Sequence, residues 1–428
     1  MDKIKYLISK LYKFVFKQSI SGEAKLFLKN LGIISIGYIT SLIFAFLFQI
    51  LAGRFLGPAE YGHFSLVNSV AMFLYIPMLM GISTALIKYN AKAKQPKEKS
   101  QNISSAYNIF FILSITILII LILLSPYLTK LLSVSLEIFY LSIAFAYFYA
   151  LDTLSKATLR SLHQVKNLSF IYSSFGVIVL FIFLIFFWTG KLDYKSAVYA
   201  TFCAYTFAII FSFFKIFPYL KFKINIDITK KLLIYGTIGL MGAIASSFLA
   251  NTTKILINKF LAEDLLGIYN AYHASSINLV YLANTMLMTV FFPTVAKLDS
   301  PKLIIEKIKK ITPYVYIFVS LGVFIAQTII IFLYGNKYPY DFKLVILFAI
   351  TSALILEYGL YVWTFAAEGL KGLKMANLIS VVIAIINLSL SFYLIPHYHL
   401  YGAILATLFS YLVGVIICLQ TRNKFLIN

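Results

Sequence analysis

The sequence predicts an all-α integral membrane protein whose twelve transmembrane helices form two bundles of six. Three observations lead to this fold class. Hydrophobic residues make up 61% of the chain and charged residues only 12%, which is far from the composition of a water-soluble domain. Apolar runs of about 20 residues, each sufficient to cross a hydrocarbon core as a helix, recur along the sequence. The second half of the chain also repeats the pattern of the first.

The expected membrane spans are apolar runs separated by short polar or basic loops. A run such as 115–124 is apolar on every face, whereas a barrel strand alternates between apolar and polar residues. Helices are therefore expected throughout the chain. The expected spans cover residues 28–52, 62–87, 103–125, 135–155, 168–189, 195–216, 232–257, 265–292, 312–333, 343–366, 374–395 and 401–420.

The repeat keeps the same order of helices and loops in both halves. One constant offset places Phe55 on Phe260 and Gly62 on Gly267. Six helices are an even number, so both halves begin on the same side of the membrane as parallel repeats. Two such bundles enclose a cleft that can open to either side by rocking, which makes transport the leading function class. The expected divisions are a cytoplasmic amphipathic N-terminus at 1–27, a six-helix lobe at 28–216, a cytoplasmic linker at 217–231, a second six-helix lobe at 232–420 and a cytoplasmic tail at 421–428.

Basic residues give the chain a formal net charge of +22. Most of them lie in segments that the expected topology places on one side of the membrane, at 3–29, 88–99, 215–231 and 297–310. Because lysine and arginine gather on the cytoplasmic side of membrane proteins, this pattern predicts that both termini are cytoplasmic. The basic loops predict anionic lipids as partners and argue against nucleic acid.

Sequence motifs of catalysis or metal binding are missing. The two cysteines, Cys203 and Cys418, both fall inside expected helices, so neither a disulfide nor a metal cluster is expected. No glycine-rich phosphate loop, HExxH or GxSxG motif is present. The sequence therefore predicts a protein that is not an enzyme, has no catalytic residues, metal or cofactor, and draws its energy from a gradient or a partner.

Two acidic residues lie within expected spans and occupy equivalent positions in the repeat, Asp152 and Glu357. Ionisable groups are costly inside a membrane, so such residues are functional candidates. One or both carboxylates could take up a proton or cation and couple movement of the bundles to an ion gradient. Alternatively, Asp152 could pair with Lys156 one helical turn away and have a structural role.

The same offset relates Gln49 to Lys254 and Asn68 to His273, all within expected spans. These four residues are candidates for binding substrate in the cleft. The ammonium of Lys254 either extends to the membrane surface or faces the cleft as an anion site. A histidine such as His273 is more often a hydrogen-bonding residue between helices than a switch.

Further cations are expected near the two mouths of the cleft, Arg54 at the outer mouth and Lys156 and Arg160 at the inner mouth. Each could serve only as an interfacial anchor. If these cations line the cleft instead, the cleft is cationic at both ends. It would then favour an anionic cargo such as a phosphate or diphosphate head group.

The segment 53–66, GRFLGPAEYGHFSL, follows the first apolar helix and resembles a segment typical of polysaccharide flippases. Residues 159–167, 366–374 and 403–411 resemble further segments of these proteins. The likeness is to Wzx-like members of the superfamily that also includes MATE exporters and the lipid II flippase MurJ. It implies a twelve-helix, two-lobe fold in the bacterial cytoplasmic membrane. It also implies that the substrate is an oligosaccharide linked to undecaprenyl diphosphate, moved from the inner to the outer leaflet, with a glycan polymerase or glycosyltransferase as candidate partners.

Two other functions compete with a flippase. A MATE-like drug or cation antiporter would share the fold but would be expected to have a mainly anionic cleft. A membrane glycan polymerase would be expected to carry a large outer loop with arginine or histidine, and the expected outer loops are short.

Overall fold

The computed structural model describes residues 22–221, 225–284, 302–367 and 369–426. Every regular element among these residues is helical. The helices are α2 (Gly22–Leu56), α3 (Pro58–Leu79), α4 (Ile82–Lys92), α5 (Pro96–Leu123), α6 (Ser125–Leu132), α7 (Leu136–Ser161), α8 (Val165–Trp188), α9 (Tyr194–Ile216), the short 3-10 helix η1 (Phe217–Tyr219), α10 (Ile226–Phe260), α11 (Glu263–Ala274), α13 (Lys302–Tyr334), α14 (Phe342–Ala367) and α15 (Leu370–Leu426).

Ten helical segments in the described part of the chain are long and apolar enough to cross a membrane. The two spans expected at 374–395 and 401–420 lie within one of them, α15, whose backbone breaks at His399 (φ 52°, ψ −126°). The span expected at 265–292 corresponds to α11 and a further helical stretch at 277–284, and its remainder lies outside the described residues. The all-helical membrane fold is confirmed, and the count of twelve stays a prediction.

One expected span is interrupted. The segment 62–87 is not a single helix, because α3 ends before Met80 and α4 begins after Gly81. Both linking residues have positive φ, at 42° and 67°. A Cβ atom on Gly81 would collide with the backbone carbonyl of Gly236 in α10. The chain therefore turns where glycine allows both the left-handed backbone and the close approach of another helix.

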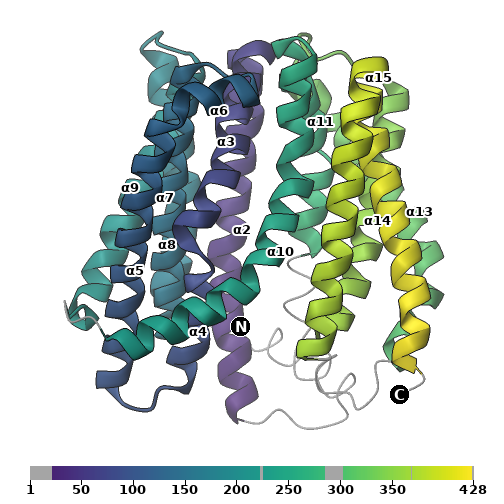
Figure 1. Ribbon diagram of the computed structural model, residues 1–428. Coiled ribbons are helices and arrows are strands. Elements are labelled where there is room, and N and C mark those ends of the chain that lie inside the picture. Colours follow the sequence, from purple (N-terminus) through teal and green to yellow (C-terminus); the bar gives the residue numbers. More distant parts are fainter. Residues whose placement is uncertain (1–21, 222–224, 285–301, 368, 427–428) are drawn as a thin grey trace, which may run out of the picture.

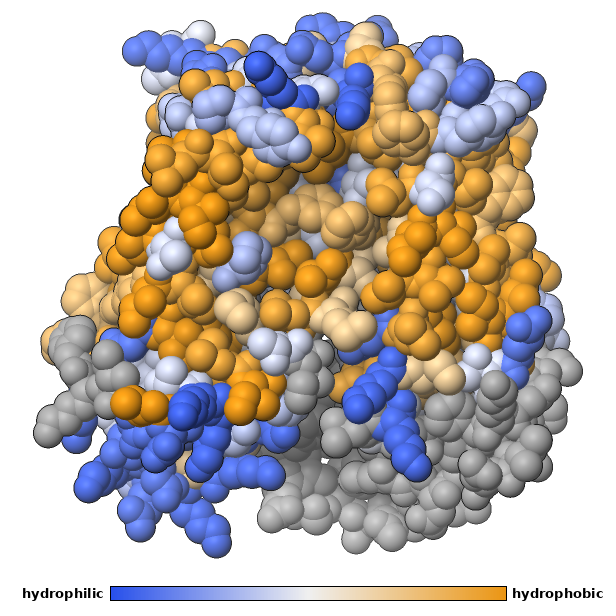
Figure 2. Space-filling model, viewed as in Figure 1, coloured by the Kyte–Doolittle hydropathy of each residue, from blue (hydrophilic) through white to orange (hydrophobic). Residues whose placement is uncertain are grey.

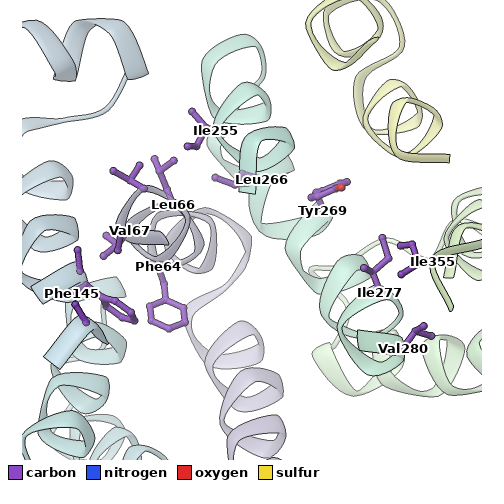
Figure 3. Packing of buried hydrophobic residues seen from close by; sticks show 14 of the residues in the cluster. Phe64, Leu66, Val67, Phe145, Ile255, Leu266, Tyr269, Ile277, Val280 and Ile355 are labelled. Atoms are coloured by element: carbon purple, nitrogen blue, oxygen red, sulfur yellow. The ribbon is translucent and has the colours of Figure 1, made fainter. Parts of the chain in front are cut away.

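The helices form two groups that stand side by side (Figure 1). We refer to α2–α9 as the first half and to α10–α15 as the second half. In the first half α2 packs along α8 and α3 along α7, while in the second half α15 packs against α10 and α14. Helix α10 joins the groups, because it also packs against α3 and α4. Buried hydrophobic side chains run continuously from Phe145 through Leu66 and Leu266 to Ile355 (Figure 3).

The surface has the layers expected of a membrane protein. Large apolar side chains such as Ile115, Phe181 and Phe318 are exposed on the sides of the helices. Figure 2 shows this apolar band between two hydrophilic ends. We call one end the lysine-rich end, where α4 connects to α5 and α9 to α10, and the other the Pro58 end, where α2 turns into α3. In water such exposed side chains would be unfavourable, so the band marks the lipid-facing surface.

Candidate functional site

A cavity of about 280 Å³ lies between the two halves of the molecule. Its walls come from α2 and α3 of the first half and from α10, α11 and the following helical stretch of the second half. Figure 2 shows the surface recessed between the two groups of helices. The lining residues are Leu42, Ala45, Phe46, Gln49, Phe64, Ser65, Asn68, Lys254, Asn270, Ala274, Asn278, Tyr281 and Leu282.

Helical spacing explains why these residues share one cavity. The residues contributed by α2 lie at 42, 45, 46 and 49, which is one face of an α-helix. Asn270, Ala274 and Asn278 are four residues apart and form a second stripe. The α2 face contributes the amide of Gln49 and the second stripe the amides of Asn270 and Asn278, so both halves supply polar groups to the cavity.

Lys254 is the cation of this cavity. It lies within the apolar segment Leu240–Phe260 of α10, and it lines the cavity. No carboxylate is among the described lining residues, and Lys254 forms no ion pair with any residue in the described part of the chain. A membrane-embedded ammonium without a carboxylate partner can bind an anionic group that enters the cavity.

The remaining polar residues in the described lining are uncharged. Gln49, Asn68, Asn270 and Asn278 present amides, which can both donate and accept hydrogen bonds. The Tyr281 hydroxyl also lines the cavity, and its oxygen lies 2.7 Å from the hydroxyl oxygen of Tyr411. Amides of this kind can bind a group that both donates and accepts hydrogen bonds.

Tyrosines close the cavity toward the Pro58 end. The Tyr61 hydroxyl donates a hydrogen bond of 2.7 Å to Oε1 of Gln49, and its oxygen lies 3.2 Å from the hydroxyl oxygen of Tyr334. Tyr61 and Tyr334 are fully buried. The Tyr338 hydroxyl donates to the backbone carbonyl of Gly53 at 2.8 Å. Tyr334 is the last residue of α13 in the second half. Its contact with Tyr61 therefore joins the two halves next to Gln49, which lines the cavity.

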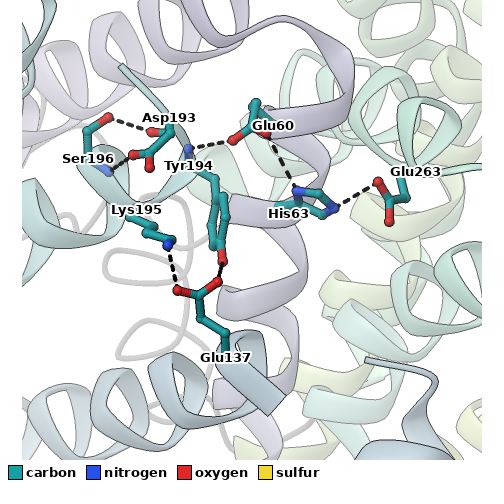
Figure 4. A network of polar contacts seen from close by, with 8 residues as sticks. All are labelled: Glu60, His63, Glu137, Asp193, Tyr194, Lys195, Ser196 and Glu263. Carbon is teal, nitrogen blue, oxygen red and sulfur yellow. Dashed lines mark hydrogen bonds and ion pairs between the residues drawn. The ribbon is translucent and has the colours of Figure 1, made fainter. Parts of the chain in front are cut away.

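A second tie between the halves lies at the surface of the Pro58 end (Figure 4). His63 of α3 lies with Nε2 3.0 Å from a carboxylate oxygen of Glu263 in α11. Its Nδ1 lies 3.9 Å from Glu60, which accepts a hydrogen bond of 2.8 Å from the backbone N–H of Tyr194. Glu137 accepts a hydrogen bond from the Tyr194 hydroxyl at 3.1 Å, so α3, α7, α9 and α11 share one polar network.

Asp152 and Lys156 lie inside the first half and do not line the cavity. The Lys156 ammonium is 2.6 Å from Oδ2 of Asp152. It also lies 5.1 Å from the centre of the Tyr172 ring and 5.2 Å from that of Phe175, both on α8. The pairing with Lys156 is thus observed, and the role of Asp152 stays a prediction. Arg160, one turn further along α7, donates to the Tyr172 hydroxyl at 3.3 Å.

Glu357 has different neighbours. It is buried in the second half, and its carboxylate accepts a hydrogen bond of 2.7 Å from the Tyr316 hydroxyl and one of 3.4 Å from the Thr312 hydroxyl. Both donors belong to α13. No cation pairs with Glu357 among the described residues. The two repeat-equivalent carboxylates thus differ, one paired with an ammonium and the other held by hydroxyl groups.

The two other candidates lie outside the cavity lining. His273 is buried on α11, with its ring centre 5.9 Å from that of Tyr269. Arg54 is exposed at the Pro58 end and donates a hydrogen bond of 3.3 Å to the backbone carbonyl of Leu333. The structure therefore brings together three of the expected substrate-binding residues, Gln49, Asn68 and Lys254.

Sequence reasoning missed several lining residues, among them Ser65, Asn270 and Asn278. The repeat carried a signal for two of them, because the offset that relates Asn68 to His273 also relates Ser65 to Asn270. The sequence carried no such signal for the contact between Tyr61 and Tyr334, because the two residues are distant in the sequence and occupy different positions of the repeat.

Residues 27–299 match the model of a family described as polysaccharide biosynthesis protein. No curated protein matches the chain significantly. Among solved structures, the inward-facing conformation of a MATE multidrug resistance transporter of the MOP superfamily aligns with a TM-score of 0.69 at 14% identity, covering 92% of this chain and 98% of the other. The lipid II flippase MurJ in an inward closed conformation aligns with a TM-score of 0.66 at 17% identity, covering 91% and 87%. The MATE multidrug transporter DinF-BH aligns with a TM-score of 0.65 at 13% identity, covering 92% and 95%. At these identities the likeness concerns the fold.

Proposed function

The chain belongs to the polysaccharide biosynthesis protein family, and we propose from this premise that it is a flippase for oligosaccharides linked to undecaprenyl diphosphate. It is a multi-pass membrane protein with the fold of MOP superfamily transporters. In the proposed reaction the cargo moves from the inner to the outer leaflet by alternating access, with no covalent chemistry. The lobes proposed to rock are residues 28–216 and 232–420, joined by the linker 217–231.

The observation that carries this proposal is the composition of the cavity between the halves. One ammonium, that of Lys254, accompanies four amides, and no described lining residue is acidic. This chemistry suits a cargo with an anionic group and many hydroxyl groups, which is the chemistry of a glycosyl diphosphate. A cationic drug would meet a cavity without a compensating carboxylate.

The size of the cavity supports binding of part of the cargo. Its volume of about 280 Å³ is at the lower limit of ordinary ligand pockets, which span roughly 300–1,000 Å³. Such a volume suits the diphosphate and the first sugar rather than a whole lipid-linked glycan. The lipid chain would remain in the bilayer, beside the exposed apolar side chains.

The proposed orientation places the lysine-rich end in the cytoplasm. This follows the general preference for basic residues on that side. The described ties between the halves at Tyr61, Tyr334 and His63 then lie on the outer side. In this orientation the structure corresponds to a state closed toward the outside, which is consistent with its likeness to inward conformations of other transporters.

Substitution of Lys254 tests the proposal. Lys254→Gln removes a charge-assisted contact, so glycan display at the cell surface should fall at least about tenfold at equal protein level. Lys254→Arg keeps the charge and should retain most activity. Lys259→Gln is the matched control, because Lys259 is an exposed residue at the end of the same helix and outside the cavity lining. Export is measured in cells that depend on this protein for glycan display.

Two results would contradict the flippase proposal. Full glycan display by the Lys254→Gln variant would show that the ammonium does not bind the cargo. Efflux of a cationic dye driven by the wild-type protein, without any effect of its deletion on glycan display, would instead support an antiporter.

A further inference from the structure

A second pocket lies at the lysine-rich end, away from the cavity between the halves. It forms where the last turn of α4 meets the first turns of α5 and α10, and its volume is about 420 Å³. Figure 1 shows that α10 starts at this end and crosses the molecule obliquely, and Figure 2 shows that hydrophilic side chains gather at this end. The lining residues are Tyr89, Lys92, Ala93, Glu98, Gln101, Asn102, Ile228, Lys231 and Leu232.

Two lysines from different helices face this pocket, Lys92 of α4 and Lys231 of α10. Neither forms an ion pair within the described part of the chain. Glu98 is the acidic residue among the described lining residues, and its carboxylate already accepts a hydrogen bond of 3.2 Å from the backbone N–H of Lys94. The pocket therefore has an excess of positive charge, with amide donors on Gln101 and Asn102.

Contacts between the helices hold the walls of the pocket in place. The Lys88 ammonium lies 3.5 Å from the centre of the Tyr235 ring, which joins α4 to α10. Asn102 of α5 donates to Asn90 of α4 at 3.0 Å, and Asn90 donates to Ser161 of α7 at 2.9 Å. The positive charges thus converge on a preformed site, whereas lysines in a flexible loop would be spread over the surface.

The start of α10 has the pattern of a helix at a membrane surface. Ile226 and Ile234 are each 67% exposed, while Lys230 and Lys231 lie between them. Exposed isoleucines beside lysines are favourable where hydrocarbon meets the head groups. Ile228 and Leu232 give the pocket itself an apolar wall.

We propose that this pocket binds the phosphate head group of an anionic membrane lipid. Lys92 and Lys231 contact the phosphate, Gln101 and Asn102 donate to its oxygens or to the rest of the head group, and the acyl chains lie along the apolar side of α10. The lipid contacts α4 and α5 of the first half and α10 of the second half at the same time. This site is independent of the cargo cavity and of the flippase proposal.

The test uses the purified full-length chain in mixed micelles, with lipid binding measured by native mass spectrometry. Phosphatidylglycerol should bind the wild-type protein more tightly than phosphatidylcholine. Since a lysine near an anionic lipid contributes about 1 kcal/mol, or about fivefold in affinity, the double variant Lys92→Gln/Lys231→Gln should bind phosphatidylglycerol about 25-fold more weakly. Lys92→Arg/Lys231→Arg should bind it as the wild type does.

Matched variants separate a pocket from general surface charge. Lys94→Gln/Lys97→Gln removes the same number of charges from exposed positions, one in the adjoining loop and one in the first turn of α5, that do not line the pocket, and it should lose far less affinity. Glu98→Gln removes the negative charge from the lining and should bind phosphatidylglycerol several-fold more tightly. Equal losses in the two lysine pairs, or weaker binding by Glu98→Gln, would overturn the proposal.

Competition against bound phosphatidylglycerol shows which phosphate compound the pocket prefers. Displacement of phosphatidylglycerol by undecaprenyl phosphate at equal concentration would identify the carrier lipid as the occupant and support a lipid phosphate site. Displacement by inorganic pyrophosphate at that same concentration would show that the lipid chain is not needed and would overturn the lipid assignment. No displacement by either competitor leaves phosphatidylglycerol as the occupant, which is the expected result.

Discussion

At the scale of residues, the two buried carboxylates show how equivalent positions can acquire different chemistry. Asp152 has the Lys156 ammonium at 2.6 Å, so the pair is neutral as a whole. Glu357 is contacted by the hydroxyl groups of Tyr316 and Thr312. A carboxylate without a cationic partner can exchange a proton without leaving an ammonium unpaired. Of the two candidates, Glu357 is therefore the one we propose for ion coupling.

This difference predicts opposite behaviour in a transport assay. Glu357→Gln should keep the hydrogen bond from Tyr316 but lose the dependence of glycan display or liposome transport on the proton gradient. The double variant Asp152→Asn/Lys156→Gln should keep that dependence, because it replaces one neutral pair with another. The single variant Asp152→Asn leaves the partly buried Lys156 ammonium without its carboxylate and should cost more stability than the double variant. Unchanged gradient dependence in Glu357→Gln would remove Glu357 as the coupling site.

Side-chain positions were only partly predictable, since the sequence locates a residue along a helix but does not show which way its side chain points. Lys254 and Lys156 both lie within apolar helices. Packing turns Lys254 toward the cavity and Lys156 toward Asp152 and the α8 aromatics. Arg54, expected at the outer mouth of the cleft, lies exposed at the Pro58 end, where it donates to a backbone carbonyl. The direction of each side chain depends on the rotation of its helix, which long-range contacts determine.

At the scale of elements, the break between α3 and α4 depends on Gly81. Hydropathy predicted one continuous span there, because Met80 and Gly81 do not interrupt the apolar run. The turn becomes necessary only when the backbone of α10 approaches at Gly236. A contact with a distant helix therefore decides the local backbone, which a local pattern cannot reveal.

Replacing Gly81 should consequently be costly. Gly81→Ala places a Cβ at positive φ and against the Gly236 carbonyl, so the protein should lose more than about 1 kcal/mol of stability. Gly322→Ala is the matched control, because Gly322 lies within α13 and has no atom within 4 Å of an added Cβ. That variant should be neutral or gain up to about 1 kcal/mol from helix propensity. Denaturation in detergent measures both, and similar stability of the two variants would contradict the account of the break.

At the scale of the whole molecule, composition and apolar runs were sufficient to predict the all-helical membrane fold. They could not show which side chains join the two halves, because those contacts are made between helices distant in the sequence. Gln49 both lines the cavity and accepts the hydrogen bond of Tyr61. Tyr61 in turn lies beside Tyr334 of the second half. A ligand that binds the Gln49 amide therefore competes with the contact that holds the Pro58 end closed.

Weakening that contact should open the Pro58 end. In a chain with Cys203→Ser, Cys418→Ala and Ser65→Cys, a membrane-impermeant thiol reagent applied from the Pro58 side should label the cavity slowly. Adding Tyr61→Phe removes the hydroxyl that joins Gln49 and Tyr334, so labelling should become several-fold faster. Tyr199→Phe alters an exposed tyrosine outside the cavity lining and serves as control. Equal labelling rates with and without Tyr61→Phe would show that the tyrosine pair does not hold this end closed.

The close approach of α3 and α11 has a mechanical consequence. At Gly62, an added Cβ would meet the backbone of Glu263 and Gly267, and the repeat-equivalent Gly267 lies against the carbonyl of Pro58. Side-chain ridges that interdigitate resist a change of crossing angle, but two glycines present no ridges. In the proposed rocking of the halves, this contact would be the pivot. It lies near the Pro58 end, so a rotation about it would move the distant lysine-rich end further than the Pro58 end.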